Sequence, residues 1–113
     1  MLPNAENAQI SIDKLEKYLL SEAHPVGRSK AEFFKALGFS PQTVEELWQG
    51  LLEIAKTGKV IDKISSLFGD KYIVDDVIEG PTGRSARIRT VWLMEQGTPR
   101  FITAYPTGEQ VDK

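Results

Sequence analysis

The sequence contains no cysteine, which excludes disulfides, thiolate metal sites and a cysteine nucleophile. Histidine is almost as scarce: His24 is the only one, so one chain cannot supply a metal site built from several histidines. No apolar run approaches the roughly 20 residues that span a bilayer, and we expect no membrane association. The first residues lack the basic and apolar segments of a signal peptide, so we expect a cytoplasmic location.

A large excess of basic residues is also missing. Lysine and arginine number 14 and the acids number 16, a formal net charge of −2, which excludes a protein that is strongly basic overall. The distribution is uneven, because positions 84–105 hold four arginines and a single acid, Glu95. A local anion site is therefore compatible with the sequence. No nucleotide loop, metal motif or nucleophilic serine motif is present, and we expect neither cofactor nor metal.

The length of 113 residues predicts a single domain, with residues 1–10 as a lead-in and 106–113 as a frayed tail. A chain of this size can bury a core without covalent staples. Its composition, 41% hydrophobic and 27% charged, is that of a folded protein.

Helical signals fill the first half of the chain. Ser11 is a candidate N-cap, Ser29 and Glu32 have the spacing of a capping box, and Ser40 precedes a proline at the first helical position. Gly38 and Gly58 stand where helices stop. These signals predict helices at about 12–21, 30–37 and 41–57.

Residues 59–70 are ambiguous, because four apolar side chains there suit either a short helix or an anchored loop: Ile61, Ile64, Leu67 and Phe68. From Lys71 the apolar period changes to about two residues, which predicts strands at 72–78, 86–94 and 100–105. Helices followed by strands indicate an α+β fold. We expect N-terminal helices packed on a three- to four-stranded antiparallel sheet.

Alternation in the central strand places Arg87 and Arg89 on one face and Trp92 on the other. Two arginines two residues apart could hold a phosphate through bidentate donors. The alternative is a solvated face whose arginines pair with Asp75 or Asp76. Trp92 could stack on a base, or it could belong to the core.

His24 is the natural candidate for proton transfer, and the proline after it favours an extended conformation. Arg28 and Lys30 follow at the start of a predicted helix, where backbone N–H groups also favour an anion. The alternative is a histidine that only caps or packs, followed by two solvated cations.

Thr103 and Tyr105 share one face of the last predicted strand. Both can donate a hydrogen bond to a phosphate, and Tyr105 could act as an acid or base if its pKa were shifted. The alternative is that both are ordinary strand residues.

Several segments together resemble a small uncharacterised bacterial domain family, and the match covers nearly the whole chain. These segments are Leu2-Pro3-Asn4-Ala5, His24-Pro25-x-Gly27-Arg28-x-Lys30-Ala31-x-x-Phe34, Leu37-Gly38, Trp92 and Pro99-Arg100-x-x-Thr103-Ala104-Tyr105. That family is similar in outline to the toxin ribonucleases grouped as barnase, EndoU, colicin and RelE-like.

The resemblance implies a metal-independent endoribonuclease, the toxin of a bacterial toxin–antitoxin system, in which a 2′-hydroxyl attacks the adjacent phosphate. It assigns acid/base chemistry to His24 and phosphate orientation to Thr103 or Tyr105. With one histidine, the second proton carrier must be Tyr105, Lys30 or an acid. The residues that would hold the phosphate are Arg28, Lys30, Arg87 and Arg89.

The implied partners are an RNA substrate and a small cognate antitoxin protein, and a homodimer stays open. A second hypothesis is a non-catalytic binding module, an immunity or antitoxin-like protein that engages a protein partner. The net acidity and the acidic pairs Glu45-Glu46 and Asp75-Asp76 motivate it.

Overall fold

The computed structural model describes residues 2–19 and 28–110. A 3-10 turn (Ala5–Asn7) precedes α1 (Ile12–Lys14), which continues as a π-helical turn (Leu15–Leu19). Next come α2 (Arg28–Ala36), a 3-10 turn (Pro41–Thr43) and α3 (Val44–Thr57). The strands follow as β1 (Lys59–Ser66), β2 (Gly69–Glu79), β3 (Ser85–Glu95) and β4 (Thr98–Gln110). None of the described helices is long and apolar enough to cross a membrane.

The four strands form one antiparallel sheet in the order β1-β2-β3-β4, which confirms the predicted α+β class. The segment 59–70 is neither the helix nor the loop that we considered, because β1 pairs with β2 from Lys59↔Asp75 to Ser66↔Gly69. Its isoleucines, Ile61 and Ile64, have helical spacing but are 42% and 46% exposed. Their spacing therefore does not reflect a buried helical stripe.

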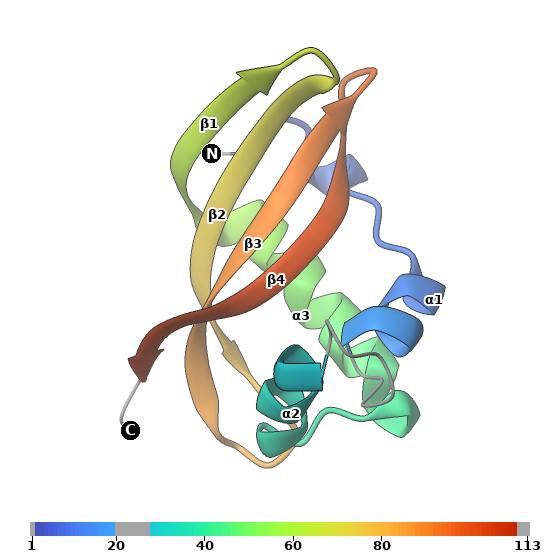
Figure 1. Ribbon diagram of the computed structural model, residues 1–113, viewed down its shortest axis with the longest axis vertical. Helices are drawn as coiled ribbons and strands as arrows, with labels where there is room; N and C mark the ends of the chain where they lie inside the picture. The colour runs from blue at the N-terminus through green and yellow to red at the C-terminus, as the bar shows by residue number, and fades with distance from the viewer. Residues whose placement is uncertain (1, 20–27, 111–113) are drawn as a thin grey trace.

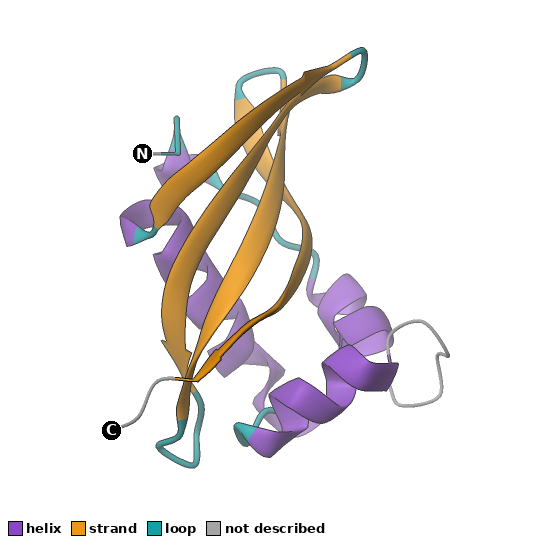
Figure 2. Ribbon diagram, turned by 60° about the vertical axis from the view of Figure 1, so that its left-hand side comes forward, coloured by secondary structure: helices purple, strands orange, loops and turns teal. Residues whose placement is uncertain are grey.

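The helices cover one face of the sheet. Figure 1 shows α3 crossing behind the strands, with α1 and α2 on the side of β4, and Figure 2 shows the same two layers after rotation. The side chains between the layers include Leu15, Phe34, Leu47, Leu51, Val74, Ile88, Trp92 and Phe101, all at most 2% exposed.

The third helix forms as predicted. Ser40 and Thr43 complete a capping box, Pro41 stands at the start, and Gly58 ends the helix with its N–H donating to the Ile54 carbonyl. The apolar residues of α3 repeat at helical spacing and are buried against the sheet, with Leu47 and Leu51 fully enclosed: Val44, Leu47, Leu51, Ile54 and Ala55. This apolar stripe is the main packing surface of the helical layer.

The second helix ends as predicted but does not begin as predicted. Gly38 adopts φ +102°, and the Phe39 N–H donates to the Phe34 carbonyl, a helix stop that favours glycine. Ser29 lies inside α2, because the helix already includes Arg28, so Ser29 is not its N-cap. The spacing of Ser29 and Glu32 therefore does not mark the start of this helix.

The last strand runs past Pro106 to Gln110, so the predicted tail is strand over most of its length. Pro106 pairs with Ile88 of β3. A proline is tolerated there because β4 is an edge strand, whose outward-facing N–H groups take no part in the sheet. The lead-in covers the other end of this edge, where the Gln9 N–H donates to Pro99 and the Phe101 N–H donates to Gln9.

A buried hydrogen-bond chain joins the two central strands. The Trp92 indole N–H donates to the Thr90 hydroxyl at 2.8 Å, and that hydroxyl donates to the Val74 carbonyl at 2.8 Å. Thr90 and Trp92 are both fully buried. The threonine therefore satisfies a donor that the helical layer cuts off from water.

We expect Thr90→Val to lower the free energy of unfolding by about 1–3 kcal/mol, because the isosteric change leaves the indole N–H buried without an acceptor. Urea denaturation measures this. Thr57→Val is the matched control, since the exposed Thr57 hydroxyl bonds only the Glu53 carbonyl of its own helix, and it should cost less than about 0.5 kcal/mol. Equal losses would contradict the proposed role of the buried chain.

Candidate functional site

The central strand β3 separates two kinds of surface. Ile88, Thr90 and Trp92 point to the helices and are fully buried. Arg87 and Arg89 occupy the alternating positions and are partly exposed. They lie on the side of the sheet where no described helix packs, which we call the open face.

The last strand adds the other two predicted residues to the open face. Tyr105 pairs with Arg89, and Thr103 pairs with Val91, one step along β3 on the same side. Arg87, Arg89, Thr103 and Tyr105 therefore share one partly exposed surface. This is the surface that strand alternation predicted for each strand separately.

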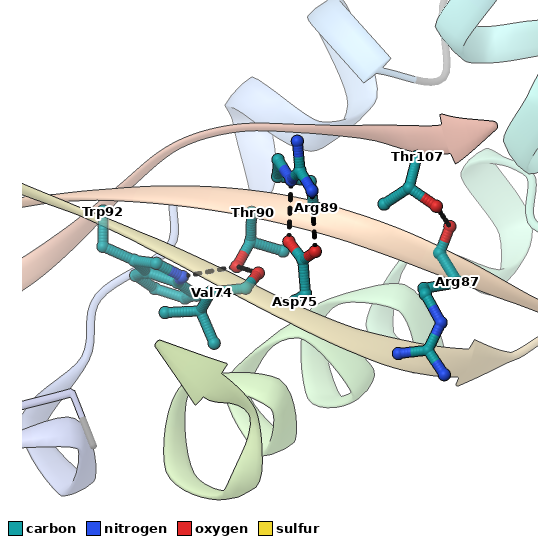
Figure 3. A network of polar contacts seen from close by, with 7 residues as sticks. All are labelled: Val74, Asp75, Arg87, Arg89, Thr90, Trp92 and Thr107. Atoms are coloured by element: carbon teal, nitrogen blue, oxygen red, sulfur yellow. Dashed lines mark hydrogen bonds and ion pairs between the residues drawn. The ribbon is translucent and has the colours of Figure 1, made fainter. Parts of the chain in front are cut away.

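Arg89 is bound to Asp75 of the neighbouring strand. Its Nε and Nη2 donate to the two carboxylate oxygens, each at 2.9 Å (Figure 3). The Asp75 side chain is 13% exposed and the Arg89 side chain 36%. Pairing of a β3 arginine with Asp75 of β2 was one of the two interpretations of the sequence, and it is correct for Arg89. Two of its N–H donors are already directed at an acid, so it does not offer a phosphate the whole guanidinium fork.

Arg87 lies one step further along the same face, opposite Val77. Its carbonyl accepts a hydrogen bond of 3.4 Å from the Thr107 hydroxyl (Figure 3). This bond ties the start of β3 to the far part of β4, beyond Pro106. It holds the backbone that carries Arg87 in the sheet.

Trp92 is not a stacking surface for a base. The side chain is fully buried on the helix face, and its ring packs edge-on against Phe101 with centroids 5.4 Å apart. The core interpretation is correct, because position 92 has the opposite parity to the arginines. We therefore leave Trp92 out of the site.

The helical half of the predicted site is described only in part. His24 lies outside the described residues, and so do the side chains of Arg28 and Lys30. The backbone places Arg28 and Lys30 in the first turn of α2, and α2 packs beside β4, the strand of Thr103 and Tyr105. The α2 helix belongs to the helical layer, whereas Thr103 and Tyr105 lie on the open face, so the described residues do not bring the two halves onto one surface. The contact between His24 and the arginines stays a prediction.

The sequence reasoning did not assign a role to the β1–β2 hairpin, which carries an unusual surface. Leu67 is 100% exposed and Phe68 84%, at the tip of the hairpin. Four of the five large apolar side chains that are exposed in the described part of the chain lie in this hairpin: Ile61, Ile64, Leu67 and Phe68. Their spacing in the sequence suggests buried anchors, but the structure leaves all four side chains exposed. We call these four residues the hairpin patch.

The hairpin patch borders a charged pair and a shallow cleft. Lys63 lies 3.5 Å from Asp70 and 5.7 Å from the centre of the Tyr72 ring; Tyr72, and then Asp70, raise the pKa of Lys63. The cleft, of about 790 Å³, runs between the hairpin tips and is lined by Gln9, Leu67, Phe68, Gly69, Met94, Glu95, Gln96 and Thr98. Among the described residues, no three histidine or carboxylate side chains are grouped to hold a metal.

We expect Arg89→Ala to lower the free energy of unfolding by about 1–3 kcal/mol, because it leaves a largely buried carboxylate without its charged donor. Arg100→Ala is the matched control. Arg100 binds Glu95 in the same bidentate way, at 2.9 and 3.0 Å, but their side chains are 46% and 49% exposed. That change should cost about 0–1 kcal/mol. Urea denaturation of both variants measures the difference, and equal costs would show that burial of Asp75 does not matter.

Comparison with known proteins finds a solved structure with the same fold and a family model that matches the chain. No curated protein sequence matches the chain. A solved chain from the contact-dependent growth inhibition toxin–immunity protein complex of Klebsiella pneumoniae 342 has the same fold, with a TM-score of 0.74 and 19% identity over 93% of this chain and 97% of that one. A family model matches residues 1–108, which confirms the predicted membership of an uncharacterised domain family. The chain belongs to the family described as a domain of unknown function, DUF6883.

Proposed function

We propose that this chain is a toxin domain that cleaves RNA without a metal ion, and that a small antitoxin or immunity protein binds and silences it. One observation carries the proposal. The strand register brings Arg87, Arg89, Thr103 and Tyr105, each selected from the sequence for phosphate chemistry, onto the one sheet face that the described helices leave open. Cationic and hydroxyl donors on one exposed surface suit a phosphodiester.

The proposed reaction is an internal transfer at phosphorus. A base removes the proton of the 2′-hydroxyl, the 2′-oxygen forms a bond to phosphorus, and the bond to the 5′-oxygen breaks as that oxygen receives a proton. His24 is the proposed acid or base, and Tyr105, Lys30 or an acid is its counterpart. Arg28, Lys30, Arg87 and Arg89 stabilise the charge on phosphorus, while Thr103 orients the phosphate. The products are a 2′,3′-cyclic phosphate and a 5′-hydroxyl.

One sequence resemblance and one structural similarity support a role in a toxin system. The resemblance to the barnase, EndoU, colicin and RelE-like ribonucleases suggests RNA as the substrate. The Klebsiella chain of the same fold comes from a complex of a growth inhibition toxin with its immunity protein. The Klebsiella complex supports a role within a toxin system and a protein partner, whether this chain corresponds to the toxin or to the immunity protein.

We expect Arg87→Ala and Tyr105→Phe each to lower the cleavage rate about 10- to 1,000-fold, because each removes a group that stabilises or protonates the transition state. Single-turnover cleavage of labelled cellular RNA in EDTA measures the rate. Arg84→Ala is the control, since Arg84 lies outside β3 in the β2–β3 turn and bonds the Ala36 carbonyl. A rate loss in the control as large as in the variants would move the site off the open face.

His24→Ala tests the helical half of the site. We expect expression of the wild-type chain to stop growth and degrade RNA, and the variant to be harmless, because a proton carrier contributes about 100- to 10,000-fold. Growth curves and RNA gels, with western blots to confirm equal protein levels, measure this. Normal growth and intact RNA with the wild-type chain would refute the ribonuclease proposal.

The hairpin patch also fits a second candidate, a binding module whose task is to engage another protein. Exposed apolar side chains that gather in one place commonly mark a protein interface. This patch serves either candidate, because a toxin also needs a surface for its partner. The two candidates differ in catalysis, which the RNA assay measures directly.

We expect Leu67→Ser combined with Phe68→Ser to weaken binding to the cognate partner at least about tenfold, because apolar anchors dominate protein interfaces. Calorimetric titration with the product of the adjacent reading frame measures the affinity. Ile12→Ser is the control, as Ile12 is 36% exposed and lies away from the hairpin. Unchanged affinity in the double variant would place the partner elsewhere.

A further inference from the structure

A polar row crosses the open face from one edge of the sheet to the other. The row takes one residue from each strand: Lys59 pairs with Asp75, Asp75 with Arg89, and Arg89 with Tyr105. The same-face neighbours of Asp75 along β2 are apolar, Ile73 and Val77. The charged residues directly opposite Asp75 on the adjoining strands are Lys59 on β1 and Arg89 on β3, and Asp62 and Arg87 lie diagonal to it on the same face. Only Asp75 brings a negative charge to this row.

The carboxylate lies beneath the guanidinium rather than beside it in solvent. Asp75 is 13% exposed and Arg89 36%, so the acid is the more enclosed member of the pair. Two parallel bonds of 2.9 Å set both the position and the plane of the guanidinium, which one bond would not do. The backbone that carries both residues is also rigid, because β2 and β3 are the two inner strands of the sheet.

A negative charge here opposes the binding of an anion. Asp75 cancels much of the charge of Arg89, and a face evolved only to attract phosphate would gain affinity without it. The other arginines proposed to hold the phosphate, Arg28 and Arg87, need no acid for that role. The benefit that offsets this cost is geometric, because a guanidinium held in advance loses no rotational freedom when the phosphate arrives.

We propose that Asp75 is a positioning residue of the RNA-cleaving site, which fixes the Arg89 guanidinium toward the phosphate. This inference rests on the proposed ribonuclease function. Asp75 acts through Arg89 and does not itself touch the substrate. Asp75 lowers the affinity of the open face for an anion and raises the rate of cleavage. Its removal should therefore strengthen binding and slow turnover.

Four proteins test this assignment: the wild type, Asp75→Asn, Arg89→Met and the double variant. We expect Asp75→Asn to lower kcat about 10- to 100-fold, because the guanidinium is no longer held, and to leave KM unchanged or lower. In the Arg89→Met background the same change should alter kcat less than about twofold, because no guanidinium is left to position. Glu95→Gln is the matched control, since it breaks the exposed bidentate pair with Arg100, and it should leave kcat unchanged.

A second measurement does not depend on activity. The Arg89 Nε–H should give a slowly exchanging NMR signal in the wild type that is lost in Asp75→Asn, while the other amide signals show that the variant is folded. If Asp75→Asn does not fold, Asp75→Glu replaces it, since a longer carboxylate keeps the charge and shifts the guanidinium.

The outcomes separate the inference from the function that it rests on. If the wild type does not cleave RNA, the proposed function fails, and the inference with it. If the wild type cleaves and Asp75→Asn keeps full kcat, the inference alone is overturned. A large further loss on adding Asp75→Asn to Arg89→Met also overturns it, because Asp75 would then act on the substrate directly. A raised KM with unchanged kcat would show that the pair serves binding only.

Discussion

The antiparallel register that holds β3 between β2 and β4 is the constraint on which the rest of the structure depends. Alternate residues of β3 point to opposite sides of the sheet, and the helices bury only one side. A slip of one residue would bury the arginines and expose Trp92. The buried chain from Trp92 through Thr90 to the Val74 carbonyl opposes such a slip, because it pairs donors and acceptors in one register only.

The same register creates a conflict on the open face. Arg89 is placed where it can meet an anion, yet it is also placed opposite Asp75, which takes two of its donors. From sequence, an arginine pair for phosphate and an arginine paired with an acid are alternatives. In the structure Arg89 is the arginine that pairs with an acid, and Arg87 lies beside it on the same face, opposite Val77.

Local sequence patterns predicted correctly those helices and strands whose capping, turn and apolar signals match the contacts that they make in the fold. The third helix has a cap, a proline at the start, a regular stripe and a glycine at the end, and all of them are used. Segment 59–70 shows the opposite case. Its isoleucines suggested a helix, but pairing with β2 satisfies the backbone, and the side chains are left exposed. Exposure of apolar residues cannot be read from the residues themselves, because it depends on what packs on them.

The predicted site divides in the same way. Strand parity was enough to assign Arg87 and Arg89 to one side of β3, and Thr103 and Tyr105 to one side of β4. Alternation within each strand does not show that the arginines of β3 and the hydroxyls of β4 lie on the same face of the sheet. That depends on the register between the strands, which pairs Tyr105 with Arg89. Alternation also does not show which face the helices cover. From sequence alone, Trp92 could therefore either stack on a base or belong to the core.

By itself, then, the sequence determined the α+β class, the end of α3, the stop at Gly38 and the parity of the three predicted strands. These depend on interactions within a few residues, such as caps, left-handed turns and alternation. Only the tertiary structure decided that 59–66 is a strand, that Arg89 binds Asp75 and that the hairpin patch is exposed. Each of these depends on contacts between residues far apart in the chain, and local sequence does not specify which distant surface a segment will meet.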